Sequence, residues 1–339
     1  MDGYRVAILG ATGMVGREFI KILRQRQLPI SDLILLASDR SAGKTVEVGG
    51  KSIVVRETSR DSFHGVDVVL ASAGAEISRE FSPIAAESGA VVVDNSGAFR
   101  MEPDVPLVVP EVNLEDAKGH NGIIANPNCS TIQMVVALNP IHKVNPIKRI
   151  IVDTYQAVSG TGSNAVDELV EQAVTVAGGG KAEPKVYPHQ IAFNVLPHIE
   201  PFQDNGYSRE EMKMLLETRK IMHAPDILVS ATTVRVPVQI GHAEAVHIEL
   251  TNPMSPEEAR EILSRAPGVV VQDDPAASVY PTPWDAAGRD EVFVGRIRKD
   301  ISHPRGLAMW IVSDNLRKGA ALNAVQIAEA LIENRWLRK

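Results

Sequence analysis

The sequence predicts an α/β protein of two domains, the first a doubly wound parallel sheet and the second an α+β domain with a mixed sheet. The chain has 339 residues, more than one hydrophobic core usually holds, so about two domains are expected. In its first third, short apolar runs alternate with segments long enough to cross over between parallel strands. Further on, apolar and polar residues alternate with period two, which is typical of a sheet with one covered face.

The first domain is expected to span residues 1–128. Its predicted strands are residues 5–9, 33–37, 66–71, 91–94 and 122–125. These segments are short and apolar, as buried parallel strands are. A helix within residues 313–339, rich in Ala, Leu and Ile, is expected to pack back on this domain and complete it.

A glycine-rich turn follows the first strand and opens the first predicted helix. It reads Gly10-Ala11-Thr12-Gly13-Met14-Val15-Gly16. A turn in this position lets backbone amides approach a pyrophosphate, whose charge is favoured by the positive end of the helix. We therefore predict a Rossmann-type dinucleotide site formed by Gly10, Thr12, Gly13, Met14 and Val15, the alternative being an ordinary glycine turn.

The second strand ends in the sequence Ser38-Asp39-Arg40-Ser41, about twenty residues further on. An acid here would hold the ribose 2′-hydroxyl of NAD, whereas an arginine accommodates the 2′-phosphate of NADP. Ser38, Arg40 and Ser41 favour NADP, with Asp39 pointing outward. The alternative is that all four residues face solvent in a loop.

The only cysteine, Cys129, lies between a strand that ends at Ala125 and a helical segment, at the predicted carboxyl edge of the parallel sheet. Ligands gather at this edge, and a thiol at a helix amino terminus ionises more readily and is a better nucleophile. A lone cysteine is otherwise a small buried hydrophobic residue. The polar neighbours of Cys129 favour the nucleophile.

The second domain is expected over residues 129–312. Its predicted strands are residues 150–156, 228–238, 243–250, 291–297 and 307–312. The segment at residues 246–250 shows the alternation of a mixed or antiparallel sheet. Four charged residues between the strands recur at helical spacing, a pattern typical of a solvated helix face. They are Glu210, Lys213, Glu217 and Lys220.

Single polar residues of this chain have both an ordinary and a functional interpretation. Gln156 closes a strand, Arg235 lies on a strand and His242 follows Gly241, and spacing alone does not bring them together. In the ordinary interpretation, Gln156 is a hydrogen-bonded polar residue at a strand end, Arg235 forms a salt bridge and His242 lies in a turn. Arg100 is likewise more often a surface cation than an anion ligand.

Composition and charge exclude several classes of partner. The chain is 44% hydrophobic and 23% charged, as an ordinary globular protein is. The net charge of −7 is spread without a Lys/Arg block, so neither nucleic acid nor an anionic membrane is expected. No apolar run approaches the roughly 18 residues of a membrane span, and the amino terminus runs straight into a strand without a signal peptide. We expect a cytoplasmic protein with a free thiol and no metal site.

Together, these motifs resemble those of the aspartate-semialdehyde dehydrogenase family, in the family's order and along nearly the whole chain. The matching segments are residues 10–16, 37–44, 94–100, 126–131, 155–160, 210–213, 234–237, 241–244 and 313–320. A match along nearly the whole chain is more specific than any one motif. It therefore favours the functional interpretation of Gln156, Arg235, His242 and Arg100 over the ordinary one. The resemblance implies an NADP-dependent dehydrogenase whose second domain is catalytic and pairs two subunits through its sheet, giving a homodimer.

The resemblance also implies a role for each candidate residue of the second domain. Cys129 would be the nucleophile, Gln156 would orient the bound intermediate, and His242 would serve as acid and base. Arg235 would hold the substrate's α-carboxylate and Glu210 its amino group. A bidentate guanidinium suits a carboxylate, so the chemistry agrees with this assignment.

Further residues are assigned by the same resemblance to phosphate and cofactor. The expected phosphate ligands are Arg100, Asn128 and Lys213. The expected additions to the cofactor site are Ser72, Ser159, Gly160 and Asn315. Asp39 departs from the family's pattern by adding an acid to the adenosine-ribose loop, which puts the cofactor preference in question.

The implied reaction is the reversible, NADPH-dependent reduction of L-4-aspartyl phosphate to L-aspartate 4-semialdehyde and phosphate through a Cys129 thioester. Its product would serve the biosynthesis of lysine, diaminopimelate, threonine, methionine and isoleucine. One alternative is an N-acetylglutamyl-phosphate reductase, but Glu210 beside Lys213 better suits a free ammonium group. Another is a non-catalytic NADPH-binding regulator, which would need no reactive thiol.

Overall fold

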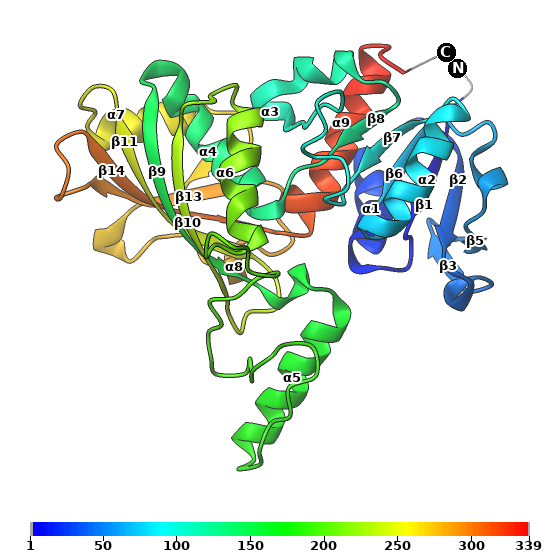
Figure 1. Ribbon diagram of the computed structural model, residues 1–339, viewed down its shortest axis with the longest axis horizontal. Helices are drawn as coiled ribbons and strands as arrows, with labels where there is room; N and C mark the ends of the chain where they lie inside the picture. Colours follow the sequence, from blue (N-terminus) through cyan, green and yellow to red (C-terminus); the bar gives the residue numbers. More distant parts are fainter. Residues whose placement is uncertain (1–2, 338–339) are drawn as a thin grey trace. The chain divides into compact units, whose positions relative to one another are not determined.

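The computed structural model describes residues 3–337, which form two compact units. Of these residues, 3–128 and 320–337 form one unit, and Cys129–Gly319 form the other. The first unit is built on a parallel sheet and the second on a mixed sheet, so the predicted fold class is confirmed (Figure 1).

The first unit contains a six-stranded sheet in the order β5-β2-β1-β6-β7-β8. Its strands are β1 (Tyr4–Leu9), β2 (Ile30–Ala37), β5 (Arg56–Glu57), β6 (Val68–Ala71), β7 (Val91–Asp94) and β8 (Ile123–Ala125). All neighbouring strands run parallel. The chain moves outward from β1 in both directions, so the sheet has its topological switch point between β1 and β6, where ligands bind in folds of this kind.

Helices cover both faces of this sheet. They are α1 (Met14–Arg26), α2 (Ala75–Glu87), the one-turn α3 (Pro110–Asn113) and α9 (Leu322–Glu333). Along β1, Val6 and Ile8 join a core cluster with α1 and α9, whereas Ala7 and Leu9 join a second cluster on the other face, beside α2. Burial on both faces explains why these strands are continuous apolar runs in the sequence.

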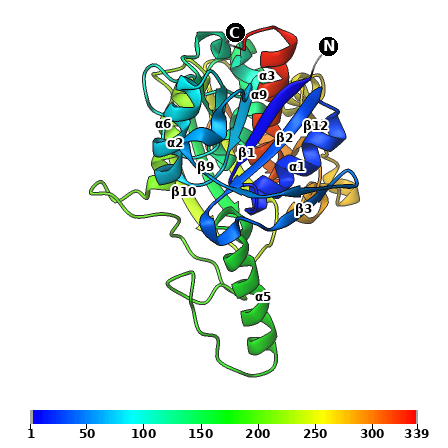
Figure 2. The ribbon, with the colours of Figure 1, turned by 90° about the vertical axis from the view of Figure 1, so that its right-hand side faces the viewer.

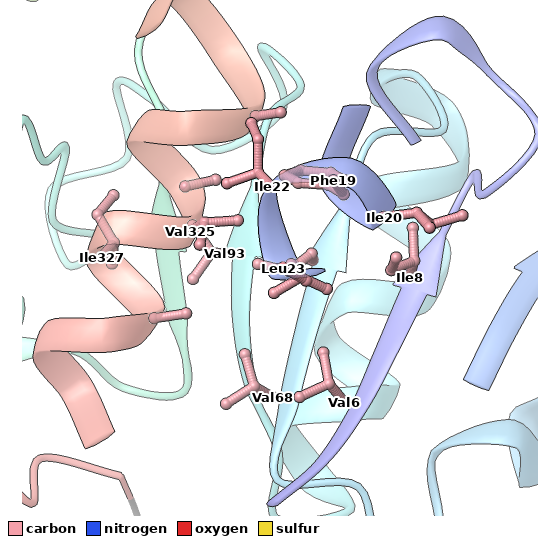
Figure 3. Close-up of a cluster of buried hydrophobic side chains, with 14 of the residues drawn as sticks. Val6, Ile8, Phe19, Ile20, Ile22, Leu23, Val68, Val93, Val325 and Ile327 are labelled. Carbon is pink, nitrogen blue, oxygen red and sulfur yellow. The ribbon is translucent and has the colours of Figure 1, made fainter. Parts of the chain in front are cut away.

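The carboxyl-terminal helix α9 belongs to the core of the first unit. In Figure 3, Val325 and Ile327 of α9 lie in the same cluster as Phe19 and Ile22 of α1. A short π-helix, Arg317–Ala321, precedes α9. The segment between β2 and β6 forms a hairpin of β3 (Thr45–Val48) and β4 (Lys51–Val54), not a crossover helix.

The second unit contains a six-stranded mixed sheet in the order β10-β9-β11-β14-β13-β12. Its strands are β9 (Ile147–Gln156), β10 (Leu228–Arg235), β11 (His242–Leu250), β12 (Val269–Val271), β13 (Val292–Lys299) and β14 (Gly306–Ser313). The pairs β9–β10 and β12–β13 are parallel, and the others are antiparallel.

One face of this mixed sheet is covered by helices. The helices of the unit are α4 (Cys129–Val144), α5 (Ser163–Ala177), α6 (Arg209–Ile221), α7 (Pro256–Ser264) and α8 (Pro283–Ala286). Helices α4, α6 and α7 contact the sheet, while α5 extends away from it (Figures 1 and 2). On β11, His242, Glu244 and Val246 are buried, whereas Ala245 and His247 alternate with them and are half-buried.

The prediction of a solvated face for residues 210–220 is wrong for two of its four members. Glu210 and Glu217 of α6 are 4% and 1% exposed. Both lie on the side of α6 that also buries Met214 and Ile221. Their carboxyl groups are therefore buried inside the unit, where they need polar partners.

Within residues 3–337, no helix is both long enough and apolar enough to cross a membrane.

Candidate active site

The glycine turn of the first unit is shaped by close contacts between backbone segments. A Cβ atom on Gly10 would lie 2.4 Å from the carbonyl oxygen of Ser72, and one on Gly16 would lie 2.2 Å from the carbonyl oxygen of Gly10. Gly10 also has a φ of +88°, a conformation that favours glycine. The turn thus lies against Ser72, which directly follows β6, at the switch point of the sheet.

The start of α1 is suited to an anion. No side chain caps the helix at Gly13, and its first turn, from Met14, carries no acidic residue. Its backbone N–H groups and its positive end favour a negatively charged group such as a pyrophosphate. Thr12 Oγ1 donates a hydrogen bond of 3.4 Å to Ser41 Oγ, which connects the glycine turn to the loop after β2. These residues fit a dinucleotide.

The loop after β2 forms a single 3-10 turn, Asp39–Ser41. Asp39 and Arg40 are both exposed. Asp39 Oδ1 accepts a hydrogen bond of 2.7 Å from the backbone N–H of Arg40, so the carboxylate is occupied by its own turn. The exposure of Asp39 agrees with the predicted outward orientation.

Arg100 is held by the backbone of the first unit. It is 8% exposed, and its Nε and Nη2 atoms donate to the carbonyl oxygens of Asn126 (3.0 Å) and Asn95 (2.9 Å). Next to Asn95, burial raises the pKa of the Asp94 carboxyl, although the Ser96 N–H, at 2.6 Å, opposes the shift. Arg100 is therefore a buried, oriented cation and not a surface one.

In the second unit, Cys129 is the first residue of α4, where the positive end of the helix favours a thiolate. Its side chain is half-buried and forms no disulfide. Gly319, in the π-helix, lies directly against it, because a Cβ atom on Gly319 would be 2.9 Å from the Cβ atom of Cys129. Only a residue without a side chain fits beside Cys129 at this point.

Gln156, the last residue of β9, links the start of α4 to α6. Its Nε2 atom donates to Ser130 Oγ at 2.5 Å and to Glu210 Oε1 at 3.1 Å. Ser130 directly follows Cys129, so this amide fixes the first turn of the helix relative to the sheet. Glu210 is also paired with Lys213, whose Nζ atom lies 3.2 Å from Glu210 Oε2 and 2.5 Å from Glu200.

Arg235 and His242 meet at Ala157, the residue after Gln156. Arg235 is the register partner of Gln156 in the parallel pair β9–β10, and its Nη1 atom donates to the Ala157 carbonyl oxygen at 2.7 Å. The Ala157 N–H donates to His242 Nδ1 at 3.0 Å. A Cβ atom on Gly160 would lie 3.1 Å from Arg235 Nη1 and 3.4 Å from His242 Nε2, so Gly160 faces both side chains.

His242 is fully buried. Burial lowers its pKa from the usual 6.5 to about 3, and the positive charge of Arg235 adds to the effect, while Glu210 opposes it. Among residues 3–337, no hydrogen-bond partner reaches His242 Nε2 or Arg235 Nε. Two buried donors therefore remain for a ligand.

Family models match both parts of the chain. The model described as the semialdehyde dehydrogenase NAD binding domain matches residues 5–120, and the one described as the semialdehyde dehydrogenase dimerisation domain matches residues 138–318. A protein of Aquifex aeolicus named aspartate-semialdehyde dehydrogenase is 57% identical over 98% of each chain. This chain belongs to the aspartate-semialdehyde dehydrogenase family.

Solved structures of aspartate-semialdehyde dehydrogenases agree with this membership. An enzyme II of this name from Vibrio cholerae, complexed with ASA, is 48% identical, with a TM-score of 0.94 over 98% of this chain and 99% of that one. An enzyme from Candida albicans with NADP is 28% identical, with a TM-score of 0.75 over 98% and 99% of the two chains. The comparisons support an oxidoreductase with a nucleotide-binding domain.

The structure brings together the residues predicted for the chemistry of an aspartate-semialdehyde dehydrogenase. Cys129, Gln156, Glu210, Arg235 and His242 belong to one connected region of the second unit. The candidates located in the first unit are Gly10, Thr12, Gly13, Met14, Val15, Ser38, Arg40, Ser41, Ser72, Arg100 and Asn128. Their individual roles stay predictions.

Ser159 and Asn315, predicted to bind cofactor, are bonded to each other beside His242. Asn315 Nδ2 donates to Ser159 Oγ at 3.0 Å, and Asn315 Oδ1 accepts from the Gly241 N–H at 2.8 Å. Both side chains are 3% exposed. They fasten the residue before His242 to the loop that contains Gly160.

Sequence reasoning missed Glu244, which lies on the covered face of the sheet two residues after His242. It is fully buried, and burial raises the pKa of its carboxyl well above the usual value, with the charge of Glu210 adding to the shift and Gln133 opposing it. Gln133 accepts a hydrogen bond of 2.7 Å from Ser313 Oγ. Extending the alternation of residues 246–250 backward would have placed Glu244 inside.

Proposed function

We propose that this protein catalyses the reversible, NADPH-dependent reduction of L-4-aspartyl phosphate to L-aspartate 4-semialdehyde and phosphate through a thioester on Cys129. The observation that carries the proposal is the bonded cluster of the second unit. In it, Gln156 connects the helix of Cys129 with Glu210, and Ala157 connects Arg235 with His242. The product would enter the biosynthesis of lysine, diaminopimelate, threonine, methionine and isoleucine.

The charges of the cluster fit an α-amino acid. Arg235 has a buried Nε donor that no residue among 3–337 engages, which suits the α-carboxylate of the substrate. Glu210 is a buried carboxylate that suits the ammonium group. A free ammonium group gains from the charge of Glu210, whereas an acetylated amine would offer this carboxylate no positive charge.

The phosphate group is assigned to Arg100, Asn128 and Lys213. Arg100 supports this role because two backbone carbonyl oxygens hold its guanidinium in place. Lys213 is 20% exposed at its side chain, so its ammonium remains accessible while it pairs with Glu210 and Glu200. Cations fixed before binding lose little entropy when a dianion arrives.

The cofactor is assigned as NADP. The uncapped start of α1, Gly10 and Thr12 would hold the pyrophosphate, and Ser38, Arg40 and Ser41 would hold the 2′-phosphate. Ser72, Ser159, Gly160 and Asn315 complete the proposed site. When bound, NADPH supplies a hydride, and the chain contributes binding and orientation. The Candida albicans enzyme with NADP supports this assignment.

In the proposed mechanism, the thiolate of Cys129 attacks the acyl carbon of the substrate. A C–S bond forms while the carbonyl π electrons move to oxygen, and their return breaks the bond to phosphate. Gln156 orients the acyl group, since its amide is fixed between Ser130 and Glu210. After hydride adds to the thioester carbon, the C–S bond breaks, the aldehyde leaves and the thiolate is restored. His242 serves as acid and base, taking and returning the proton in each half of the reaction.

A homodimer through the second unit is part of the proposal. The face of the mixed sheet away from α4 and α6 carries Tyr155 and Trp310, whose rings lie 5.3 Å apart, and Tyr155 is 37% exposed. Further exposed apolar residues follow on α5 and the loops after it: Val170, Val174, Val186, Phe193, Val195 and Phe202. A second copy of this chain would cover such a surface.

The test follows NADPH formation from aspartate semialdehyde and phosphate, with NADP or NAD, and compares the intact protein with Cys129→Ala. Phosphate-dependent reduction of NADP is expected, with a loss of roughly 10⁴-fold or more in the variant. Unchanged NADPH binding and unchanged thermal unfolding of the variant are the controls. Undiminished turnover without the thiol, or turnover only with the N-acetylated glutamate analogue, would contradict the proposal.

A further inference from the structure

The helix that begins at Cys129 is buried on every side over its first three turns. All residues of α4 from Ser130 to Asn139 are buried. Apolar contacts have no preferred direction, so they do not select one rotation of such a helix about its own axis. Hydrogen bonds do have a direction. The position of Cys129 therefore depends on the polar contacts of α4.

Hydrogen bonds from the mixed sheet reach α4 at Ser130 and at Gln133. Gln156 Nε2 donates to Ser130 Oγ at 2.5 Å, and Ser313 Oγ donates to Gln133 Oε1 at 2.7 Å. Gln133 follows Cys129 by four residues, so it lies one turn further along the same face of the helix. Its amide is therefore placed to control the rotation of the turn that carries the thiol.

A second layer of polar side chains lies one step deeper along the same elements. Thr154 precedes the end of β9 by two residues, Glu244 follows the start of β11 by two, and the two residues are register partners. Both are fully buried. Two residues of a strand and four residues of a helix advance by similar lengths, about 6.7 Å and about 6 Å. Gln133 therefore belongs to the same layer.

Several polar atoms of this layer have no hydrogen-bond partner among residues 3–337. They are Gln133 Nε2, Thr154 Oγ1 and both carboxyl oxygens of Glu244, and all of them are buried. Gln133 is near enough to Glu244 to oppose the rise in its pKa, yet no hydrogen bond joins the two side chains. Unpaired buried polar atoms are costly, and a buried water molecule typically bonds to about three of them.

The donors and acceptors of the layer match one water molecule. Gln133 Nε2 donates, and Thr154 Oγ1 can donate or accept. Burial raises the pKa of Glu244 well above its usual value and the charge of Glu210 adds to the shift, so the carboxyl is a neutral acid with one donor and one carbonyl acceptor. A water molecule between them would accept from Gln133 and donate to Glu244 and Thr154.

We propose that Glu244 is a positioning residue for Cys129. With Gln133 and Thr154 it encloses one water molecule, and this internal site connects the first turns of α4 to β9 and β11 and fixes the rotation of the helix. The inference rests on the proposed function, because it concerns the placement of the thiolate that attacks the acyl carbon. Glu244 acts through the amide of Gln133 and takes no part in bond making.

Two substitutions of Glu244 separate its polar contacts from its volume. Glu244→Met fills a similar volume without hydrogen-bonding groups, and such a replacement of a buried acid is often close to neutral for stability. Misplacement of the thiol should nevertheless lower kcat by roughly 10- to 10²-fold, with the KM for aspartate semialdehyde unchanged. Glu244→Gln keeps a neutral acceptor and a donor, so it should retain the kcat of the wild type. Equal kcat in the two variants would contradict the inference.

Thr154→Val repeats the test with a smaller change. It replaces one hydroxyl of the layer by a methyl group, so it decides the question even if Glu244→Met does not fold. The expected result is a lower kcat with an unchanged KM. Thr218→Val is the matched control, because Thr218 Oγ1 is also buried and unpaired among residues 3–337 but lies on α6 and outside the layer. An equal loss of kcat in both threonine variants would count against the internal site.

A crystal structure of the intact protein tests the internal site directly. The inference predicts an ordered water molecule within hydrogen-bond distance of Gln133 Nε2, Thr154 Oγ1 and the Glu244 carboxyl. In Glu244→Met this water should be absent and the Cys129 Sγ atom displaced. A direct hydrogen bond between Glu244 and Gln133 with no water between them, or an unmoved thiol in Glu244→Met, would overturn the inference.

Failure of the inference and failure of the proposed function give different results. If the protein lacks Cys129-dependent, phosphate-dependent turnover, the proposed function is wrong, and the two crystal structures still decide whether Glu244 positions the thiol. If that turnover is present and folded Glu244→Met has the kcat of the wild type, only the positioning role of Glu244 is wrong.

Discussion

The proposed nucleotide site and the proposed catalytic cluster are built in opposite ways. The part of the first that would hold the pyrophosphate and the 2′-phosphate is local, since Gly10 and Thr12 share one turn, and it relies on backbone N–H groups and exposed side chains such as Arg40. The second is assembled from α4, β9, α6, β10 and β11, and its side chains are almost all buried and bonded to one another. A substitution in the nucleotide site should therefore affect only the contact that it removes. A substitution in the catalytic cluster should also displace the side chains bonded to the altered residue.

The largest effect is expected in the buried cluster, where acid should destabilise the fold through His242. Its pKa in the folded protein is about 3, below the usual 6.5, so between these values the unfolded chain binds a proton that the folded chain refuses. Stability contributed by the neutral ring is present above pH 6.5 and is lost as the pH falls toward 3. The loss should be on the order of 4 kcal/mol relative to His242→Gln.

Urea unfolding of both proteins across this range measures the difference. Glu244→Gln provides a control of opposite sign, because the folded pKa of Glu244 is raised. The stability contributed by the protonated carboxyl is present below its ordinary pKa of 4.5 and is lost as the pH rises. The free energy of unfolding of Glu244→Gln should therefore increase relative to that of the wild type as the pH rises. Parallel curves for all three proteins would mean that burial in this cluster has no electrostatic consequence.

The next effect concerns Gly160, which leaves room for two side chains of the cluster. Gly160→Ala would place a Cβ atom 3.1 Å from Arg235 Nη1 and 3.4 Å from His242 Nε2. The guanidinium of Arg235 must shift by a few tenths of an ångström, and misplacement of this kind should lower kcat/KM by up to roughly 10²-fold. Gly178→Ala is the matched control, since its nearest neighbour would be 3.4 Å away. Equal kcat/KM in the two variants would show that the cluster accommodates the added methyl group without loss of the catalytic geometry.

The contrast between local sites and sites assembled from distant segments also decides which features the sequence predicts well. The parallel strands are buried on both faces and therefore appear as apolar runs, and the glycine turn needs only a strand before it and a helix after it. Cys129 was identified because a helix begins at it. All three are local patterns, and the first two lie in the first unit.

What the sequence alone did not predict depends on partners that are distant in the chain. Glu210 and Glu217 have the spacing of a solvated face, yet Glu210 is buried because Gln156 and Lys213 satisfy it. The bonds of Ala157 involve only its backbone, so its residue type carries no signal. Glu244 is a charged residue at a position where the alternation of the strand predicts a buried apolar one. This signal is visible only once the predicted strand is extended back to His242.

In the nucleotide site, Gly10→Ala should have a smaller effect than Gly160→Ala has on the chemistry. The substitution puts an alanine at a φ of +88° and a Cβ atom 2.4 Å from the Ser72 carbonyl oxygen. The turn must shift to relieve this contact, and a shift that removes about 1.4 kcal/mol of binding free energy would raise the Kd for NADPH about tenfold. Gly50→Ala has a similar φ of +79° and no neighbour within 4 Å, so it separates strain from crowding. Equal NADPH titrations for the two variants would exclude a role for the close approach.

The smallest effect is expected for the acid that departs from the family's pattern. Asp39→Asn keeps an oxygen that can accept from the Arg40 N–H but removes the charge beside the proposed 2′-phosphate site. Because Asp39 is exposed, the change in NADPH affinity should be an improvement of about 0.2–1 kcal/mol, and Arg40→Gln should weaken NADPH more than it weakens NADH. Titration of both cofactors with each variant gives the ratio directly. If Asp39→Asn instead abolished the preference between cofactors or altered kcat, a single exposed residue would be coupled to the buried cluster, and the local and assembled sites could no longer be treated as independent.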